Sequence, residues 1–193
     1  MGILITGVVL SAHSSEPSVV GQVPPFEDLD VMARTSVSPA AFATHIEARN
    51  PRVDPIYLRV VYRTYREECL REGVSLVVAL AQMAHETGYL EFNGSVGAIQ
   101  YNFAGLGATG PGVPGLAFPD IRTGIRAHVQ HLKAYGDTSD PISEIVDPRF
   151  GLVKRGSGTT VTALTGRWAT DPLYGEKVLA HAYRLLALTG RSD

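Results

Sequence analysis

The most apolar helix that the sequence predicts is Ser75-Leu-Val-Val-Ala-Leu-Ala-Gln-Met-Ala-His-Glu-Thr-Gly88. At roughly 100° per residue, its apolar side chains cover the whole circumference of a helix, and only Gln82, His85 and Glu86 interrupt them. A helix that is apolar on all sides lies inside a protein, so we expect this helix at the centre of the fold. Gly88 fits the left-handed residue that ends a helix.

Glu86 falls in the last turn of this helix, beside unpaired carbonyl groups and the negative end of the helix dipole. Burial and the dipole both disfavour a carboxylate, so we expect the pKa of Glu86 to be raised. A carboxyl group that stays protonated near neutral pH can serve as the general acid that cleaves a glycosidic bond. The alternative is that Glu86 is a solvated surface group, as most glutamates are.

Length and composition limit the class of protein. A chain of 193 residues is long enough for one domain with a full core. Charged residues make up 19% of the chain and the net charge is -2, which predicts no polyanion-binding surface and no nucleic-acid partner. The single cysteine, Cys69, has no partner for an internal disulfide, and we expect it to be a buried thiol.

The first residues need a separate interpretation. Residues 2–12 have the length of a signal-peptide apolar region, but the first Lys or Arg of the chain is Arg34. The segment is too short to span a bilayer as a helix, so no membrane span is predicted. It is either a trimmed export segment or an ordinary strand or arm. We therefore divide the chain into an N-terminal arm, residues 1–37, and a catalytic domain, residues 38–193.

Helix start signals recur along the domain. Ser38-Pro39, Asp54-Pro55 and Asp171-Pro172 each combine an N-cap residue with a proline in the first turn. They predict helices over residues 38–49, 54–72 and 171–190, and apolar spacing predicts two more over residues 120–135 and 162–168. The segment 89–119 is rich in glycine and proline and is expected to be loop or very short strands. No alternating strand series is present, so the predicted fold is mainly α.

Two patterns that suggest a cofactor are rejected. Gly105-x-Gly107-x-x-Gly110 matches the dinucleotide fingerprint, but Pro111-Gly112 follows it in place of a helix. His85, His128 and His131 could in principle bind a metal, but their spacing alone does not supply ligand geometry. We predict neither a metal nor an organic cofactor.

A sugar-binding groove usually combines aromatic platforms with amide and carboxyl groups. Residues near and after Glu86 in the chain supply both kinds. We predict a substrate-binding set of Gln82, Tyr101, Asn102, Phe103, Trp168 and Tyr174. The alternative for Phe103 and Trp168 is that they pack the core, and the simplest role for Asp171 is that of an N-cap.

Four blocks of the chain resemble a known family in their order and content. They are Ala81-Gln-Met-Ala-His-Glu-Thr-Gly88, Asn102-Phe-Ala-Gly-Leu-Gly-Ala108, Phe118-Pro-Asp-Ile-Arg-Thr-Gly-Ile-Arg-Ala-His128 with Leu132-Lys-Ala-Tyr135, and Trp168-Ala-Thr-Asp-Pro-Leu-Tyr-Gly-Glu-Lys177. They are similar to bacterial endo-β-N-acetylglucosaminidases of glycoside hydrolase family 73, which include autolysins and flagellar peptidoglycan hydrolases. The resemblance covers roughly residues 55–188.

The resemblance implies a lysozyme-like helical lobe, here with a reduced or absent β-lobe. It implies hydrolysis of the β-1,4 bond after N-acetylglucosamine in peptidoglycan, with Glu86 at the position of the general acid and glycan strands as the binding partner. A protein with this activity is expected to be secreted, periplasmic or associated with the cell envelope.

The second catalytic group is left open by the sequence. Many members of the family carry a second acidic residue in a longer β-lobe, whereas residues 109–119 contain no carboxylate. Asp120 and Glu91 are the nearest candidates, and the 2-acetamido group of the substrate is a third route. Two alternative functions remain: a lytic transglycosylase, which needs only one acid, and a non-catalytic glycan-binding or assembly module.

Overall fold

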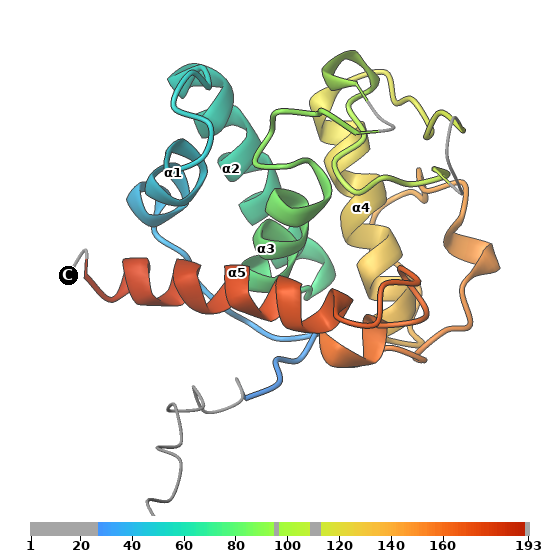
Figure 1. Ribbon diagram of the computed structural model, residues 1–193. Coiled ribbons are helices and arrows are strands. Elements are labelled where there is room, and N and C mark those ends of the chain that lie inside the picture. The colour runs from blue at the N-terminus through green and yellow to red at the C-terminus, as the bar shows by residue number, and fades with distance from the viewer. Residues whose placement is uncertain (1–26, 95–96, 109–112, 192–193) are drawn as a thin grey trace, which may run out of the picture.

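The computed structural model of the chain describes residues 27–94, 97–108 and 113–191, and Figure 1 shows their arrangement. Five α-helices follow one another: α1 (Pro39–Glu47), α2 (Pro55–Glu72), α3 (Leu76–Glu86), α4 (Ile121–Gly136) and α5 (Tyr174–Thr189). Short 3-10 helices lie at η1 (Ala98–Gln100), η2 (Phe150–Leu152) and η3 (Thr162–Leu164). Within the described ranges the only β pairings are two isolated bridges, Asp30 with Thr160 and Thr165 with Ala169. The prediction of a mainly α fold is confirmed.

Helix α3 lies at the centre of the fold, as its apolar sequence predicts. Every residue from Leu76 to Ala84 is buried. Helix α5 crosses α3, while α2 and α4 pack beside it (Figure 1). Gln82 is the one polar side chain within this buried stretch, and Glu86 is the last residue of the helix. Thr87 follows as the C-cap and Gly88 adopts the left-handed conformation with φ 57°, which fits its predicted role as the stop.

The predicted N-caps explain where the first helices begin. The Ser38 hydroxyl accepts the Ala41 N–H at 3.1 Å, and Asp54 Oδ1 accepts the Ile56 N–H at 2.7 Å. The last helix begins later than predicted, at Tyr174, because Asp171 caps the turn before it and accepts the Leu173 N–H at 3.0 Å. The predicted helix over 162–168 is only the 3-10 turn η3.

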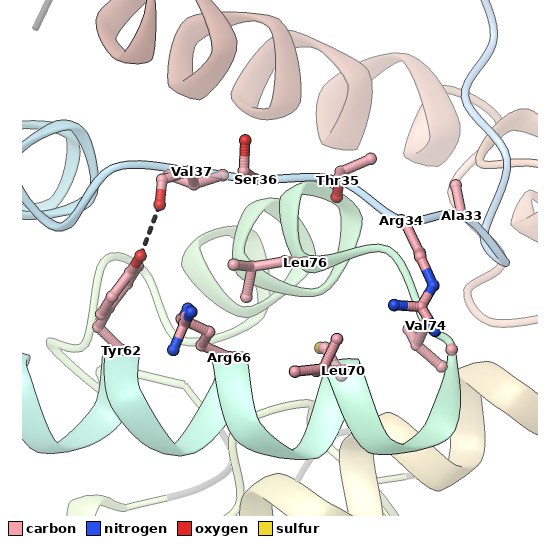
Figure 2. Close-up of a pocket in the computed structure, with 12 residues that line it drawn as sticks. Ala33, Arg34, Thr35, Ser36, Val37, Tyr62, Arg66, Leu70, Val74 and Leu76 are labelled. Carbon is pink, nitrogen blue, oxygen red and sulfur yellow. Dashed lines mark hydrogen bonds between the residues drawn. The ribbon is translucent and has the colours of Figure 1, made fainter.

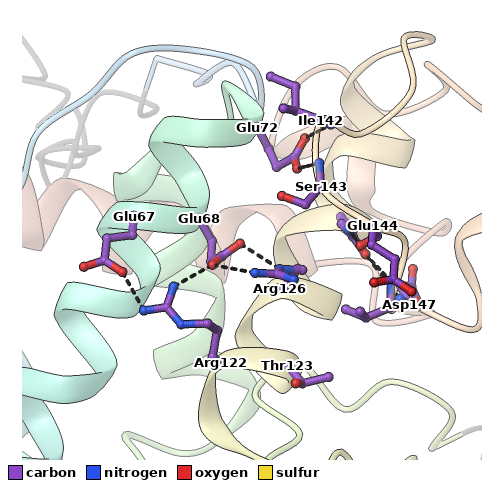
Figure 3. A network of polar contacts seen from close by, with 12 residues as sticks. Glu67, Glu68, Glu72, Arg122, Thr123, Arg126, Ile142, Ser143, Glu144 and Asp147 are labelled. Atoms are coloured by element: carbon purple, nitrogen blue, oxygen red, sulfur yellow. Dashed lines mark hydrogen bonds and ion pairs between the residues drawn. The ribbon is translucent and has the colours of Figure 1, made fainter.

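A buried ion network joins α2 to α4, and Figure 3 shows it. The Glu68 side chain is 0% exposed and accepts hydrogen bonds from Arg122 Nη1 at 2.8 Å and Arg126 Nε at 3.0 Å. Burial alone would raise the pKa of Glu68, but the hydrogen bonds from Arg126 and Arg122 outweigh it and the pKa is lowered. Glu68 on α2 therefore holds α4 in place.

Glu72 anchors the segment that follows α4. Its carboxylate accepts the backbone N–H groups of Ile142 and Ser143, each at 2.9 Å, and lies 3.7 Å from Lys133 Nζ. Because this carboxylate is buried and fully partnered, it fixes the path of the chain beyond α4 (Figure 3).

The described part of the N-terminal arm runs along the domain. Val31 is fully buried, donates its N–H to the Thr159 carbonyl at 2.8 Å and accepts the Ser75 N–H at 2.9 Å. Figure 2 shows residues 33–37 passing over α2, where the Tyr62 hydroxyl donates to the Val37 carbonyl at 2.6 Å. Residues 1–26, which include the candidate export segment, lie outside the described residues. In the part of the chain that the structure describes, no helix is long and apolar enough to cross a membrane.

Candidate active site

Glu86 opens into a groove of about 480 Å³ at the C-terminal end of α3. Its walls come from the loop 104–108, from α4 and from the segment that leads into α5. The lining residues are Glu86, Ala104, Gly105, Leu106, Gly107, Ala108, His131, Tyr135, Arg149, Arg167, Trp168, Ala169 and Thr170. Glu86 is the one carboxylate among these described lining residues.

A second hollow has no comparable chemistry. It measures about 220 Å³ and lies between residues 33–37 and α2 (Figure 2). Cys69 contributes to its wall, but the thiol is buried and burial raises its pKa well above the usual value. None of the described residues that line this hollow is a carboxylate. The groove at Glu86 is therefore the candidate active site.

The environment of Glu86 favours a protonated carboxyl. Burial raises its pKa to about 7, although the hydrogen bonds from the Tyr174 and Trp168 side chains act in the opposite direction. The Tyr174 hydroxyl donates to Glu86 Oε1 at 2.5 Å. A substantial fraction of Glu86 is thus an acid at neutral pH, which is the state that a general acid requires.

A buried chain of side-chain hydrogen bonds ends on this carboxyl. Gln82 Nε2 donates to the Tyr174 hydroxyl at 2.7 Å, and Gln82 Oε1 lies 2.8 Å from His128 Nε2. His128 Nδ1 in turn lies 2.8 Å from the Tyr65 hydroxyl. Four hydrogen bonds therefore connect α2, α4, α3 and α5 to Glu86.

The direction of each bond in this chain follows from its neighbours. Burial lowers the pKa of His128 to about 3, so its imidazole is neutral and carries one N–H. The Gln82 oxygen needs a donor, which places that hydrogen on His128 Nε2 and leaves Nδ1 to accept from Tyr65. Because the Gln82 amide donates to Tyr174, the Tyr174 hydrogen is directed to Glu86 Oε1. The acidic proton of Glu86 is then carried by Oε2.

The loop beside Glu86 is shaped by Asn102. Its side-chain amide donates to the Leu106 and Leu116 carbonyls, each at 2.9 Å, and its oxygen accepts the Leu106 N–H at 3.0 Å. Gly105 within this loop has φ +62°, and a Cβ placed there would lie 3.3 Å from Glu86 Oε2. A glycine at this position therefore lets the backbone approach the acid closely.

Trp168 contacts two other residues of the groove, Glu86 and His131. Its indole contacts the imidazole of His131, with ring centroids 4.9 Å apart, and the ring of Tyr135 at 5.8 Å. His131 Nδ1 lies 2.7 Å from Asp147 Oδ2, and the side chain of Asp147 is 0% exposed. An aromatic wall with a carboxylate-bound histidine thus faces the same groove as Glu86.

Comparison with known proteins identifies the family. The family model described as mannosyl-glycoprotein endo-β-N-acetylglucosaminidase matches residues 62–186. The chain belongs to the glucosaminidase family. The predicted resemblance is confirmed, and with it the class of glycoside hydrolase at the level of the family.

One curated relative of this glucosaminidase comes from Borreliella burgdorferi and is named only as an uncharacterized protein. It is 50% identical over 129 residues, which are 67% of this chain and 63% of the relative. The chain thus spans less than two thirds of the length of that relative. No solved structure matches the chain significantly.

Within the glucosaminidase groove, the predicted residues fall into two groups. Trp168 lines the groove and Tyr174 holds Glu86. Gln82 and Phe103 are each 0% exposed, so they lie behind the groove surface. Phe103 packs against Tyr65 with centroids 6.2 Å apart, which corresponds to the core-packing alternative.

Asn102 and Tyr101 also differ from the predicted substrate contacts. Asn102 is 0% exposed and its amide is used by backbone groups of its own loop. Tyr101 is absent from the described lining of the groove, and its carbonyl instead lies against Gly124 of α4, where a Cβ would meet it at 1.7 Å. The structure therefore places Asn102 behind the groove surface and Tyr101 outside the described lining of the groove.

The two candidates for a second carboxylate lie away from the groove. Glu91 is exposed and accepts from Asn93 Nδ2 at 2.8 Å, in a different depression from that of Glu86. Asp120 is the N-cap of α4 and accepts the Thr123 N–H at 2.8 Å. In the described structure neither lines the groove, because helix capping and solvent direct both side chains elsewhere.

The sequence interpretation missed the pair of His131 and Asp147. His131 entered it only as one of three histidines tested for metal binding, whereas the structure gives it a carboxylate partner. The three histidines also take separate partners, since His128 binds Gln82 and His85 packs against Tyr174 with centroids 5.5 Å apart. The two residues are 16 positions apart and are separated by a loop, so no pattern of neighbouring residues indicates the pair.

Proposed function

We propose that this glucosaminidase hydrolyses the β-1,4 bond after N-acetylglucosamine in bacterial peptidoglycan, with Glu86 as the general acid. The observation that carries the proposal is the state of Glu86, a groove-lining carboxyl whose pKa is raised to about 7 and whose orientation is held by Tyr174. Such a group can donate its proton to the glycosidic oxygen as the bond breaks.

Two features of the groove favour a glycan as the ligand. Trp168 and Tyr135 supply flat aromatic surface, on which the C–H face of a sugar ring can stack. The backbone of loop 104–108, which approaches Glu86 closely at Gly105, supplies amide and carbonyl groups along the other wall. Sugar hydroxyls need hydrogen-bonding groups of this kind.

The charge of the groove favours peptidoglycan over an uncharged glycan. Arg149 and Arg167 both line it. Peptidoglycan carries carboxylates on its peptide stems, and a guanidinium binds a carboxylate through two parallel hydrogen bonds. We therefore assign the arginines to the acidic substituents of the strand. Action on this polymer places the protein outside the cytoplasm, in the envelope or secreted, with residues 38–193 as the catalytic unit.

The test compares wild type with Glu86→Gln on purified peptidoglycan. The amide keeps the shape of the side chain but cannot donate the proton, so turnover should fall by about two to four orders of magnitude. Glu91→Gln is the matched control, because it makes the same change on an exposed side chain outside the groove. A folded Glu86→Gln variant that digests cell wall at the parental rate would end the assignment.

The chemical identity of the products tests the bond and the reaction. Borohydride reduction followed by mass spectrometry should label N-acetylglucosamine at the new ends. Labelled N-acetylmuramic acid would indicate a muramidase, and an anhydro-sugar would indicate a lytic transglycosylase. Binding of strands without cleavage would indicate a non-catalytic glycan-binding or assembly module. A high-mannose glycoprotein serves as the second substrate, and its cleavage in place of peptidoglycan would contradict the proposed substrate.

A further inference from the structure

One polar residue of the groove, His131, has no role in the proposed function described so far. His131 projects from α4 and lines the same groove as Glu86. Its Nδ1 atom is bound to Asp147 at 2.7 Å. Within the described residues, no hydrogen bond is recorded for the other ring nitrogen, Nε2, which is therefore available to a molecule in the groove.

Asp147 is built to hold this imidazole. Its Oδ2 faces His131, while its Oδ1 accepts the Arg149 N–H at 2.9 Å. Gln130, next to His131 in α4, accepts the Val146 N–H at 2.8 Å and the Asp147 N–H at 3.2 Å. Figure 3 shows Asp147 in the segment that runs beside α4. The carboxylate is thus fixed from both sides, and its orientation decides that of the ring.

An ionised carboxylate only accepts hydrogen bonds, so a neutral His131 carries its hydrogen on Nδ1 and presents the lone pair of Nε2. Such a nitrogen can take a proton from water. If the ring becomes an imidazolium, the buried charge of Asp147 stabilises it. A carboxylate that orients a histidine in this way is a recurrent arrangement for general bases.

His131 and Glu86 line the same groove and are linked through one side chain, Trp168. Both residues interact with Trp168: Glu86 through a side-chain hydrogen bond and His131 through ring contact at 4.9 Å. One indole therefore contacts both groups. Inverting glycosidases separate the acid from the base, by about 6.5–9.5 Å, and so leave room for the attacking water.

We propose that His131, oriented by Asp147, is the general base that activates water in this groove, and that the enzyme inverts the configuration at the anomeric carbon. The inference rests on the proposed hydrolysis. Nε2 of His131 takes a proton from water as the water oxygen bonds to the anomeric carbon. The bond from that carbon to the leaving oxygen breaks, and Oε2–H of Glu86 protonates that oxygen. Solvent then removes the proton from His131 and returns one to Glu86.

The first variant removes the proposed base but keeps the hydrogen bond to Asp147. In His131→Asn the side-chain amide nitrogen occupies the place of Nδ1, so the hydrogen bond to Asp147 is kept while Nε2 is lost. We expect kcat on purified peptidoglycan to fall by about two to four orders of magnitude with KM changed little. The matched control is His181→Asn on α5, which makes the same substitution outside the groove and should keep kcat within about twofold.

Asp147 is a positioning residue, and a second variant tests it. Asp147→Asn presents an amide that cannot stabilise an imidazolium, so kcat should fall with little change in KM.

Azide provides a rescue of a variant that lacks the base, because it is an anionic nucleophile that needs no base. In His131→Ala, added azide should restore turnover and give a glycosyl azide.

The anomeric configuration of the fresh product decides the mechanism. NMR of wild-type digests should show the α-anomer of the new N-acetylglucosamine end first. A β-anomer formed first means retention and overturns the inference, as does a His131→Asn variant whose kcat stays within a few fold of wild type. A change in KM alone would assign His131 to binding and contradict the base. If wild type releases no sugar, the proposed function itself fails, whereas retention with active wild type leaves that function intact.

Discussion

The Tyr174 hydroxyl lies 2.5 Å from Glu86 Oε1 and donates its hydrogen to that oxygen. The donor comes from the first turn of α5 and the acceptor from the last residue of α3, 88 positions earlier in the chain. This bond counteracts the effect of burial on Glu86. It also leaves Oε2, the oxygen nearest to Gly105, as the site of the acidic proton.

Replacing Tyr174 by Phe should therefore change the pH dependence of the reaction. Loss of a hydrogen bond that favours the carboxylate raises the pKa of Glu86 above about 7. Because the acid must be protonated, activity should persist to higher pH, with the descending limb displaced upward by about one unit. A pH profile of kcat measures the displacement. Tyr62→Phe is the control: it removes a phenol that donates to the Val37 carbonyl outside the groove, so the limb should stay in place. A limb that moves downward in Tyr174→Phe would contradict the argument.

The raised pKa of Glu86 also predicts a pH-dependent cost in stability. Unfolding returns this carboxyl to an ordinary pKa near 4.5. Between pH 4.5 and about 7, Glu86 is therefore mostly protonated in the folded state and mostly ionised in the unfolded state. The stabilising effect of that proton is complete below pH 4.5 and is lost as pH rises through about 7. Glu86→Gln cannot ionise, so its stability relative to wild type should increase from pH 5 to pH 8, by at most about 3 kcal/mol. Urea unfolding at the two pH values gives the difference, and an equal value at both would refute the prediction.

Gly105→Ala should impair catalysis through direct crowding. The residue has φ +62°, and the added Cβ would approach Glu86 Oε2 to 3.3 Å. We expect kcat to fall by about tenfold, since a small displacement of an acid from its productive position is costly. Gly73→Ala is the control: its φ is +76°, its Cβ would meet only Met32 Cε at 3.6 Å, and it lies outside the groove. If both variants lose stability equally and neither loses activity, crowding of the acid is not the reason for this glycine.

Glu91→Gln and Asp120→Asn should each reduce activity far less than Glu86→Gln. Glu91 is exposed in another depression, and asparagine caps a helix as well as the aspartate that it replaces at the start of α4. Assays of cell-wall digestion alongside glycan binding and circular dichroism check both variants. If either abolishes turnover while the protein stays folded and binds glycan, that residue is the second catalytic group and the role of His131 is wrong.

Much of the fold could be predicted because its signals are local. The continuous apolar sequence of α3 predicts a buried helix by itself, since no face of that helix can be left in water. Ser38-Pro39 and Asp54-Pro55 mark helix starts through hydrogen bonds to residues two or three positions ahead. The same local logic located Glu86 at the end of α3 and Gly88 at its stop.

The predictions that needed revision concern side chains whose partners are distant in the sequence. The ion pairs of Glu68 were not predicted at all, because Arg122 and Arg126 lie more than fifty positions away. Asn102 carries the amide expected of a sugar-binding residue, but that amide donates to two backbone carbonyls, those of Leu106 and Leu116. A polar side chain bonds whatever the packing brings within reach, and residue type alone does not reveal that choice.

Local sequence alone predicts the five α-helices, the central position of α3 and the place of Glu86 at its end, because periodicity, capping and a carboxyl at a helix end are properties of adjacent residues. Packing of the helices decides which side chains surround Glu86. Tyr174 and Gln82 lie 92 positions apart and His131 and Asp147 are 16 apart, so their hydrogen bonds exist only once α5 and the segment after α4 have packed around α3. The pKa of Glu86 is set in the same way, since desolvation depends on the atoms that surround a group and not on its neighbours in the chain.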